Sequence, residues 1–318
     1  MLAGPVPLAN APARARFVSR DACIACGSTD LRAVAQGRFD AEPLRGFLAA
    51  DPWGEDPLPA LGDAPWELRG CAACGQVFHR WVLDDAWQKL RFRRWMGEAA
   101  MRSFAERVGA TAFPARWSSG TNRIAHVLRL ERLTRELRTR DEAPRVLDFG
   151  CGWGELVATA TLAGCDAHGV DWDAHRLRGA GLGGDRLVGS LSELDPSLRF
   201  HAVTLFEVLE HLTEPLEVLR QLRYRLAFRG ILVVEVPDCS GVDGIRTLAE
   251  YRAVHPLEHI NAFTPASLER FVERVGFRRI ETPAAWVTAD PVRLARTAAQ
   301  RALAPWRRTT QAYFRREE

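Results

Sequence analysis

The chain has 318 residues, of which 47% are hydrophobic and 26% charged, and its net charge is +3. A chain of this length can form two domains. A net charge this small does not by itself indicate nucleic-acid binding. No run approaches the roughly 18 apolar residues of a membrane span, and prolines interrupt the apolar N-terminal residues that would otherwise suggest a signal peptide. We therefore expect a soluble, cytoplasmic protein in which residues 1–18 form a flexible, Ala/Pro-rich arm.

Two Cys-x-x-Cys pairs bound the first predicted domain, residues 19–83. The four cysteines are Cys23, Cys26, Cys71 and Cys74, and a glycine follows each pair. In a reducing compartment, four thiolates at this spacing predict a tetrahedral, structural Zn²⁺ site in a zinc-ribbon-like unit. Disulfide bonds between the same cysteines are the alternative.

Residues 84–118 are predicted to be a helical linker, because Trp87 and Trp95 belong to an apolar set that recurs at helical spacings. Arginines interrupt this set at residues 91–94. They either form a solvated face or meet an anionic group of the substrate.

A strand–loop–helix pattern at residues 145–163 organises the next predicted domain, residues 119–288. Residues 146–149 form a short, mostly apolar run typical of a buried parallel strand, and a helix is expected from residue 156. Between them, glycines at alternate positions let the backbone turn sharply and approach a ligand at a helix N-terminus. The following predicted strand ends at Asp171, about twenty residues after the loop, where the ribose of a nucleotide-like cofactor would lie.

Two classes of cofactor fit this pattern, dinucleotides and S-adenosylmethionine. The dinucleotide fingerprint is Gly-x-Gly-x-x-Gly, whereas this loop reads Asp-Phe-Gly-Cys-Gly-Trp-Gly over residues 148–154. The loop closely resembles the first motif of class I S-adenosylmethionine-dependent methyltransferases. Gly169-Val170-Asp171 resembles their second, acidic signature, and residues 206–211 resemble the end of their fourth strand. The resemblance covers roughly residues 120–285 and implies a Rossmann-like, doubly wound, seven-stranded α/β sheet.

The resemblance also implies a set of cofactor-binding residues. These are Asp148, Gly150, Cys151, Gly152, Gly154, Asp171, Trp172, Ser190, Leu191, Phe206 and Glu207. The indole of Trp172 either lies against the adenine or packs in the core.

Methyl transfer to an oxygen or an acidic carbon needs a base within hydrogen-bonding reach of the acceptor. The candidates are His259 with its neighbour Glu258, and His211, which could instead be structural. Glu207, Glu210 and His211 also resemble a stretch of ubiquinone-pathway O-methyltransferases in which such side chains bind a divalent cation.

Residues 289–318 interleave arginines with apolar residues and are predicted to be a basic amphipathic tail. Such a tail either rests on an anionic membrane surface, packs on another part of the protein or a partner, or stays solvated. The last strand is expected near residues 277–280.

We expect methyl transfer, most simply O- or C-methylation, to a small-molecule or glycoconjugate acceptor. Acidic side chains are interspersed through the cysteine-bounded domain, so a phosphate-tracking surface for nucleic acid is not expected there. The cysteine pairs and the following Gln76-Val77-Phe78 also resemble the N-terminal unit of sugar C-methyltransferases. The alternative is an RNA or protein methyltransferase that uses the zinc unit as a recognition module.

Overall fold

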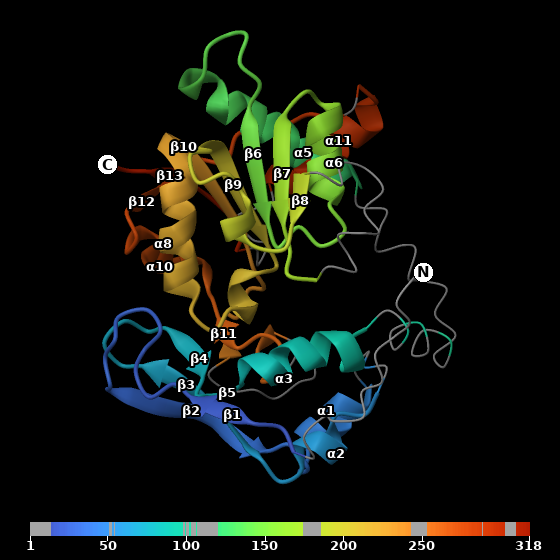
Figure 1. Cartoon of the computed structure of the whole chain (residues 1–318), viewed down its shortest axis with the longest axis vertical. Helices are drawn as coiled ribbons and strands as arrows, with labels where there is room; N and C mark the ends of the chain where they lie inside the picture. The colour runs from blue at the N-terminus through green and yellow to red at the C-terminus, as the bar shows by residue number, and fades with distance from the viewer. Residues whose placement is uncertain are drawn as a thin grey trace.

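The structure is a computed structural model that describes residues 14–50, 53, 55–97, 99, 102, 106, 120–173, 186–242, 253–287, 289–302 and 310–318. Two lobes lie one above the other along the long axis of the molecule (Figure 1). The upper lobe contains a seven-stranded sheet, and the lower lobe contains a four-stranded sheet and a two-stranded sheet.

The seven-stranded sheet has the strand order β12-β13-β10-β9-β6-β7-β8. Its strands are β6 (Arg145–Phe149), β7 (Asp166–Val170), β8 (Leu187–Val188), β9 (Phe200–Phe206), β10 (Leu226–Glu235), β12 (Phe277–Ile280) and β13 (Ala312–Arg316). The pairs from β10 to β8 are parallel, whereas β13 is antiparallel to both of its neighbours. The expected Rossmann-like, mostly parallel sheet is confirmed.

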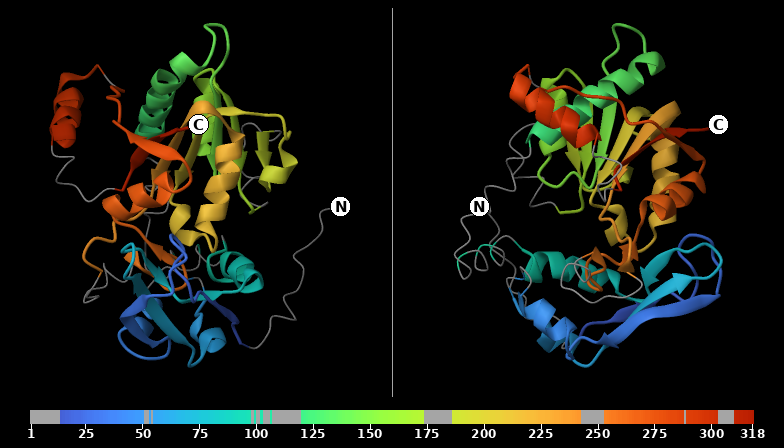
Figure 2. Two further views of the ribbon diagram at one scale, coloured as in Figure 1. Left: turned by 90° about the vertical axis from the view of Figure 1, so that its left-hand side faces the viewer. Right: turned by 180° about the vertical axis from the view of Figure 1, so that it is seen from behind.

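Helices cover both faces of this sheet (Figure 2). The helices of the upper lobe are α5 (Gly120–Thr134), η3 (Arg135–Leu137), α6 (Glu155–Leu162), η5 (Leu191–Glu193), η6 (Leu209–His211), α8 (Pro215–Arg225), α10 (Pro265–Glu273) and α11 (Pro291–Ala302). Val146 packs with residues of α5 and α6, whereas its neighbour Leu147 packs with residues of α8 and α10 on the opposite face. Because both faces of β6 are buried, its sequence is apolar at successive positions instead of alternating.

The lower lobe is built mainly from the N-terminal third of the chain. Its elements are β1 (Phe17–Ser19), β2 (Leu31–Arg38), α1 (Leu44–Ala50), α2 (Leu58–Leu61), β3 (Pro65–Cys71), β4 (Val77–His79), β5 (Trp81–Leu83), α3 (Asp85–Leu90) and the π-helix η1 (Arg91–Trp95). A late strand, β11 (Asn261–Ala262), adds to the four-stranded sheet, whose order is β11-β4-β3-β2. The two lobes therefore share a sheet, and the predicted domain boundary at residue 83 does not separate two independent units.

The segment between the two cysteine pairs forms an aromatic core of its own. Phe39, Phe47, Trp53 and Trp66 are each at most 4% exposed, and they pack with Trp87 and Trp95. The same core includes Val254 and Leu257, which follow β10 in the upper lobe's part of the sequence. Apolar burial thus joins the lobes in addition to the shared sheet.

Two of the predicted boundaries are wrong. Phe17 and Val18, assigned to the flexible arm, belong to β1, which pairs with β5. Residues 312–316, assigned to an amphipathic tail, form β13 inside the large sheet, so β12 is not the last strand. Tyr313 and Phe314 are fully buried, because both faces of this inserted strand are covered. The arginines beside these two residues gave the segment a basic pattern from which a buried strand was not predicted. Among the described residues, no helix has the length and apolar character needed to cross a membrane.

Candidate active site and cysteine cluster

The glycine-rich loop connects β6 to α6 and has the left-handed backbone that only glycine adopts without strain. Gly150, Gly152 and Gly154 have φ values of 77°, 55° and 72°. A Cβ atom on Gly150 would lie 2.3 Å from Cγ2 of Val208, whereas one on Gly152 would have nothing within 4 Å. The first glycine thus permits close packing, and the second leaves open space beside the backbone.

Two carboxylates at the strand ends have different surroundings. Asp171 is 6% exposed and accepts hydrogen bonds from the backbone N–H groups of Gly152 and Asp173, each at 2.9 Å. Asp148 accepts a 2.6 Å hydrogen bond from the Thr204 hydroxyl. Burial raises the pKa of Asp148 to about 6, although the bond from Thr204 opposes this shift. Asp171 therefore ties the glycine loop to the end of β7.

A cavity of about 610 Å³ lies beside this loop, between the two lobes. The predicted site residues that line it are Gly150, Asp171, Trp172, Ser190, Leu191, Glu207, His211 and Glu258. Phe149 and Val208 also line it, although the sequence analysis did not select them. Two of the residues predicted for the base, His211 and Glu258, thus meet the cofactor residues in one cavity, whereas His259 is not among the residues that line it.

The other predicted cofactor residues, Asp148, Cys151, Gly152, Gly154 and Phe206, are not among the residues lining the cavity. The Cys151 side chain turns towards β7, where its Sγ would lie 2.7 Å from a Cβ atom on Gly169. The Phe206 ring lies 4.5 Å from the His126 ring, between their centroids. These two side chains pack inside the upper lobe.

One wall of the cavity comes from α3 and η1, the segment predicted to be a linker. The Asp84 side chain caps α3 by accepting a hydrogen bond from Trp87 N–H at 2.9 Å. Lys89, Phe92 and Met96 then reach the cavity at spacings of three and four residues, which put them on one helix face. The Phe92 ring lies 4.8 Å from that of Trp172, whose side chain is 41% exposed and lines the cavity.

The arginines of this wall do not form one solvated face. Arg91 is 1% exposed and donates a hydrogen bond to the carbonyl oxygen of Leu257. Arg94 pairs with Glu55 instead, whereas Arg93 is exposed. Arg91 lies four residues after Trp87 and four before Trp95, so helical spacing places it on the buried face of this wall.

His211 is held in one orientation by the loop that follows β10. Its Nδ1 lies 2.8 Å from the carbonyl oxygen of Glu258. A carbonyl oxygen only accepts, so Nδ1 carries the hydrogen and the neutral ring has its lone pair on Nε2. Nε2 lies 3.5 Å from Oε1 of Glu210, and the ring centroid of His259 is 5.0 Å away.

Burial and neighbouring charges set the ionisation of this group. Burial, followed by the charges of His259 and Arg91, lowers the pKa of His211 to about 3. Burial alone would raise the pKa of Glu258, but nearby positive charges, with Arg91 the largest contributor, lower it to about 2. Burial and then Glu207 raise the pKa of Glu210. His211 is therefore neutral at physiological pH and has a lone pair available, although a pKa this low makes the ring a weaker base than a free imidazole.

Glu207 and Glu210 show two further features of a functional site. Glu207 has a φ of 55°, a strained value for a residue other than glycine, at the end of β9. Glu210 is 1% exposed, and its carboxylate lies beside the side chains of Glu207 and His211. Ligand atoms of Glu210, His211 and His259 lie within 4.8 Å of one another, which is a suitable donor set for a divalent cation.

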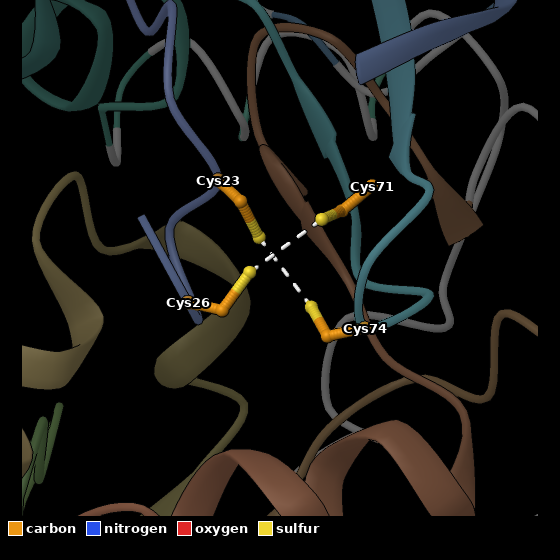
Figure 3. A group of neighbouring side chains, drawn as sticks. All are labelled: Cys23, Cys26, Cys71 and Cys74. Atoms are coloured by element: carbon orange, nitrogen blue, oxygen red, sulfur yellow. Dashed lines mark hydrogen bonds between the residues drawn. The ribbon is translucent and has the colours of Figure 1, made fainter. Parts of the chain in front are cut away.

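The four cysteines form the second candidate site (Figure 3). They are free thiols whose side chains point towards one another from the two knuckles, and the Sγ–Sγ distances of the pairs Cys23–Cys74 and Cys26–Cys71 are both 3.6 Å. Four sulfurs at about 2.3 Å from a tetrahedral Zn²⁺ would be about 3.8 Å apart, whereas a disulfide needs about 2.05 Å. The glycines after the knuckles, Gly27 and Gly75, have left-handed φ values of 74° and 76° and donate to the first cysteine's carbonyl, as the tight turns require. The two measured distances are close to the tetrahedral spacing, and all four Sγ atoms lie within 4.8 Å of one another, so the cluster suggests a metal site.

The known proteins that this chain resembles are methyltransferases. Ubiquinone biosynthesis O-methyltransferase of Rhodopseudomonas palustris (strain TIE-1) is 30% identical over 149 residues, which cover 42% of this chain and 58% of that protein. Its counterpart in Psychrobacter arcticus is 27% identical over 159 residues, covering 42% and 59%. The match therefore spans less than two thirds of these curated relatives.

Among solved structures, the plantazolicin methyltransferase BamL, in complex with a triazolic desmethylPZN analog and SAH, aligns with a TM-score of 0.49 and 12% identity, covering 73% of this chain and 96% of that one. A family model described as a methyltransferase domain matches residues 121–282, which is half of the chain. The chain therefore belongs to the methyltransferase-domain family, and this region is an S-adenosylmethionine-dependent methyltransferase domain.

Proposed function

We propose that the protein transfers a methyl group from S-adenosylmethionine to an oxygen or an acidic carbon of a small-molecule or glycoconjugate acceptor, with His211 as the base. The observation that carries this proposal is the single cavity shared by Asp171 and Trp172 on one side and His211 and Glu258 on the other. Its volume, about 610 Å³, is within the range of about 300–1,000 Å³ that is usual for small-molecule sites.

In this proposal the two sides of the cavity have separate roles. Asp171 accepts hydrogen bonds from the ribose, and Trp172 with Phe92 packs against the adenine. Bound S-adenosylmethionine supplies a methyl group already activated by its positive sulfur. The protein's main task is then to align the acceptor with the methyl–sulfur bond, which the closed wall of α3 and η1 assists by restricting the acceptor.

His211 supplies the proton chemistry. Its Nε2 takes the proton from an acceptor hydroxyl as the oxygen–methyl bond forms and the methyl–sulfur bond breaks, which leaves neutral S-adenosylhomocysteine. The hydrogen bond from Nδ1 to the Glu258 carbonyl supports this role, because it keeps the lone pair on Nε2 and stabilises the imidazolium that forms. His259 and the ionised Glu258 then surround the charged ring.

A divalent cation held by Glu210, His211 and His259 is the second arrangement that the donor set supports. It would provide positive charge beside the acceptor oxygen. The buried carboxylate of Glu210 favours it, because a cation would neutralise a charge that is costly to bury. Methyl transfer that is lost with a chelator and restored by Mg²⁺ or Mn²⁺ alone would select this arrangement over the base.

The lower lobe carries a structural Zn²⁺ on the four cysteines in this proposal. None of these cysteines is among the residues that line the cavity. One edge of the lobe's sheet is paired to β11, and Gln76 donates a 2.8 Å hydrogen bond to the carbonyl oxygen of Ala262. A lobe bound in this way favours a scaffold over a recognition module for RNA or protein.

The experiment is incubation of the purified protein with methyl-labelled S-adenosylmethionine and separate fractions of cell extract: small molecules, lipids, protein and RNA. We expect label in the small-molecule or lipid fraction, and none with His211→Gln although that variant binds S-adenosylhomocysteine normally. Label in RNA or protein would instead support the alternative. Equal labelling by His211→Gln would refute the role of the base.

A further inference from the structure

A buried network of hydrogen bonds starts at Arg20, three residues before Cys23. Arg20 is 8% exposed. Its Nε and Nη2 donate to the carbonyl oxygen of His79 at 3.0 and 2.6 Å, and Nη2 also donates to that of Ile260 at 2.7 Å. Its Nη1 donates to Oδ1 of Asn261 at 2.7 Å. One side chain of the lower lobe therefore holds two consecutive residues of a loop that lies 240 positions later.

Asn261 extends this network to the turn that carries His211. Its side chain is fully buried, and Nδ2 donates to the carbonyl oxygens of Leu209 at 3.0 Å and Leu212 at 2.7 Å. An arginine only donates, so Oδ1 must face Arg20 and both N–H groups must face the turn. These two carbonyls bracket η6, the single turn that contains Glu210 and His211.

The same loop contacts His211 directly and is anchored a second time to the lower lobe. The Glu258 carbonyl that accepts from His211 Nδ1 is three residues before Asn261. His79 lies 2.7 Å, through Nε2, from the carbonyl oxygen of Val254, and its backbone N–H donates to Ile260 at 2.9 Å. The turn and the loop are thus held to each other and to strand β4.

From this network we infer that Arg20 and Asn261 are positioning residues, which fix the η6 turn so that Nε2 of His211 faces the acceptor side of the cavity. This inference rests on the proposed role of His211 as the base. It assigns the cysteine-bearing lobe a part in building the active site, because Arg20 stands between the first knuckle and the loop. Neither residue lines the cavity, so both act through His211.

The test uses Asn261→Asp in the full-length protein. This change keeps the shape and the acceptor for Arg20, but turns an oxygen towards the carbonyls of Leu209 and Leu212 in place of two donors. The first readout is the ¹⁵N spectrum of histidine-labelled protein with S-adenosylhomocysteine bound. The His211 signal is identified as the one that is missing from the spectrum of the His211→Gln variant.

For the wild type we expect one His211 tautomer with the hydrogen on Nδ1. For Asn261→Asp we expect a mixture of tautomers, an affinity for S-adenosylhomocysteine within twofold of wild type, and about a hundredfold lower initial rate of label transfer to the extract. A purely structural role would not change the tautomer in a protein that still binds the cofactor product.

Arg20→Lys is the second variant, and it decides the question if Asn261→Asp does not bind S-adenosylhomocysteine. Lysine keeps the charge but cannot present the planar set of donors that three acceptors require. The matched control is Arg80→Lys, because Arg80 forms surface ion pairs with Asp21 and Glu67 next to β4.

The inference is overturned if a variant that binds S-adenosylhomocysteine normally keeps the wild-type His211 spectrum, or if Arg80→Lys changes it as much as Arg20→Lys. Failure of the proposed function is recognised separately, because it leaves the wild-type protein without label transfer whatever the spectra show.

Discussion

Replacement of Asp171 by asparagine tests the cofactor site most directly. The Asp171 carboxylate accepts from the N–H groups of Gly152 and Asp173 while it lines the cavity. Asparagine has the same shape, but its amide group presents two donors where the native oxygen accepts. The single amide oxygen cannot accept from both backbone N–H groups and from the ribose, so the proposed hydrogen bond from the ribose to a charged acceptor is lost in the complex.

A hydrogen bond to a charged group contributes about 1.5–3 kcal/mol. Since about 1.4 kcal/mol corresponds to a factor of ten, the dissociation constant for S-adenosylhomocysteine should rise roughly 10- to 150-fold. We expect the wild type to bind in the micromolar range, so the variant should bind in the range of tens to hundreds of micromolar. Isothermal titration calorimetry measures both values.

The control is Asp195→Asn, because the Asp195 side chain is exposed, accepts hydrogen bonds from Ser197 in its own turn, and is not among the residues that line the cavity. It should bind S-adenosylhomocysteine as the wild type does. Affinity of Asp171→Asn within twofold of the wild type would refute the assignment of the ribose site. Binding of NADH, with none of S-adenosylmethionine, would favour a dinucleotide site instead.

Three further predictions concern stability and metal content. Gly150→Ala should lower the free energy of unfolding by roughly 2–5 kcal/mol, because it combines left-handed strain with overpacking against Val208, whereas Gly152→Ala should cost only about 1 kcal/mol; urea unfolding that ranks them equally would contradict this. Elemental analysis should find one zinc per chain, and Cys71→Ser should lose it and also lower the unfolding midpoint of the upper lobe, since β11 and Arg20 join the lobes. Burial lowers the pKa values of His79, His126 and His211 from 6.5 to about 3. Between these pH values the unfolded chain binds more protons than the folded protein, so the free energy of unfolding should fall as the pH drops below 6.5. A urea midpoint that is constant between pH 7 and pH 4.5 would contradict this prediction.

The sequence by itself determined the architecture of the methyltransferase domain. The mostly apolar run of β6 can be recognised in the sequence because a strand buried on both faces takes apolar side chains at successive positions, here Val146 and Leu147. The glycines of the following loop predicted its tight turn, because residues other than glycine are strained at positive φ values and their side chains would prevent a close approach to the backbone. The two cysteine pairs likewise predicted a cluster, since each knuckle is a local structure of a few residues.

Only the tertiary structure decided which distant segments complete the site. The sequence predicted a basic amphipathic tail and left open whether it packs on the protein, whereas in the structure residues 312–316 pair with β10 and β12 inside the large sheet. The segment of α3 and η1 was predicted to be a helical linker, and only the packing of the lobes places Lys89, Phe92 and Met96 at the cavity. The network from Arg20 through Asn261 to the His211 turn links three segments by side-chain hydrogen bonds, and no periodicity in the sequence predicts such contacts. Local backbone requirements can therefore be read from residue order, whereas long-range polar contacts depend on how the lobes pack.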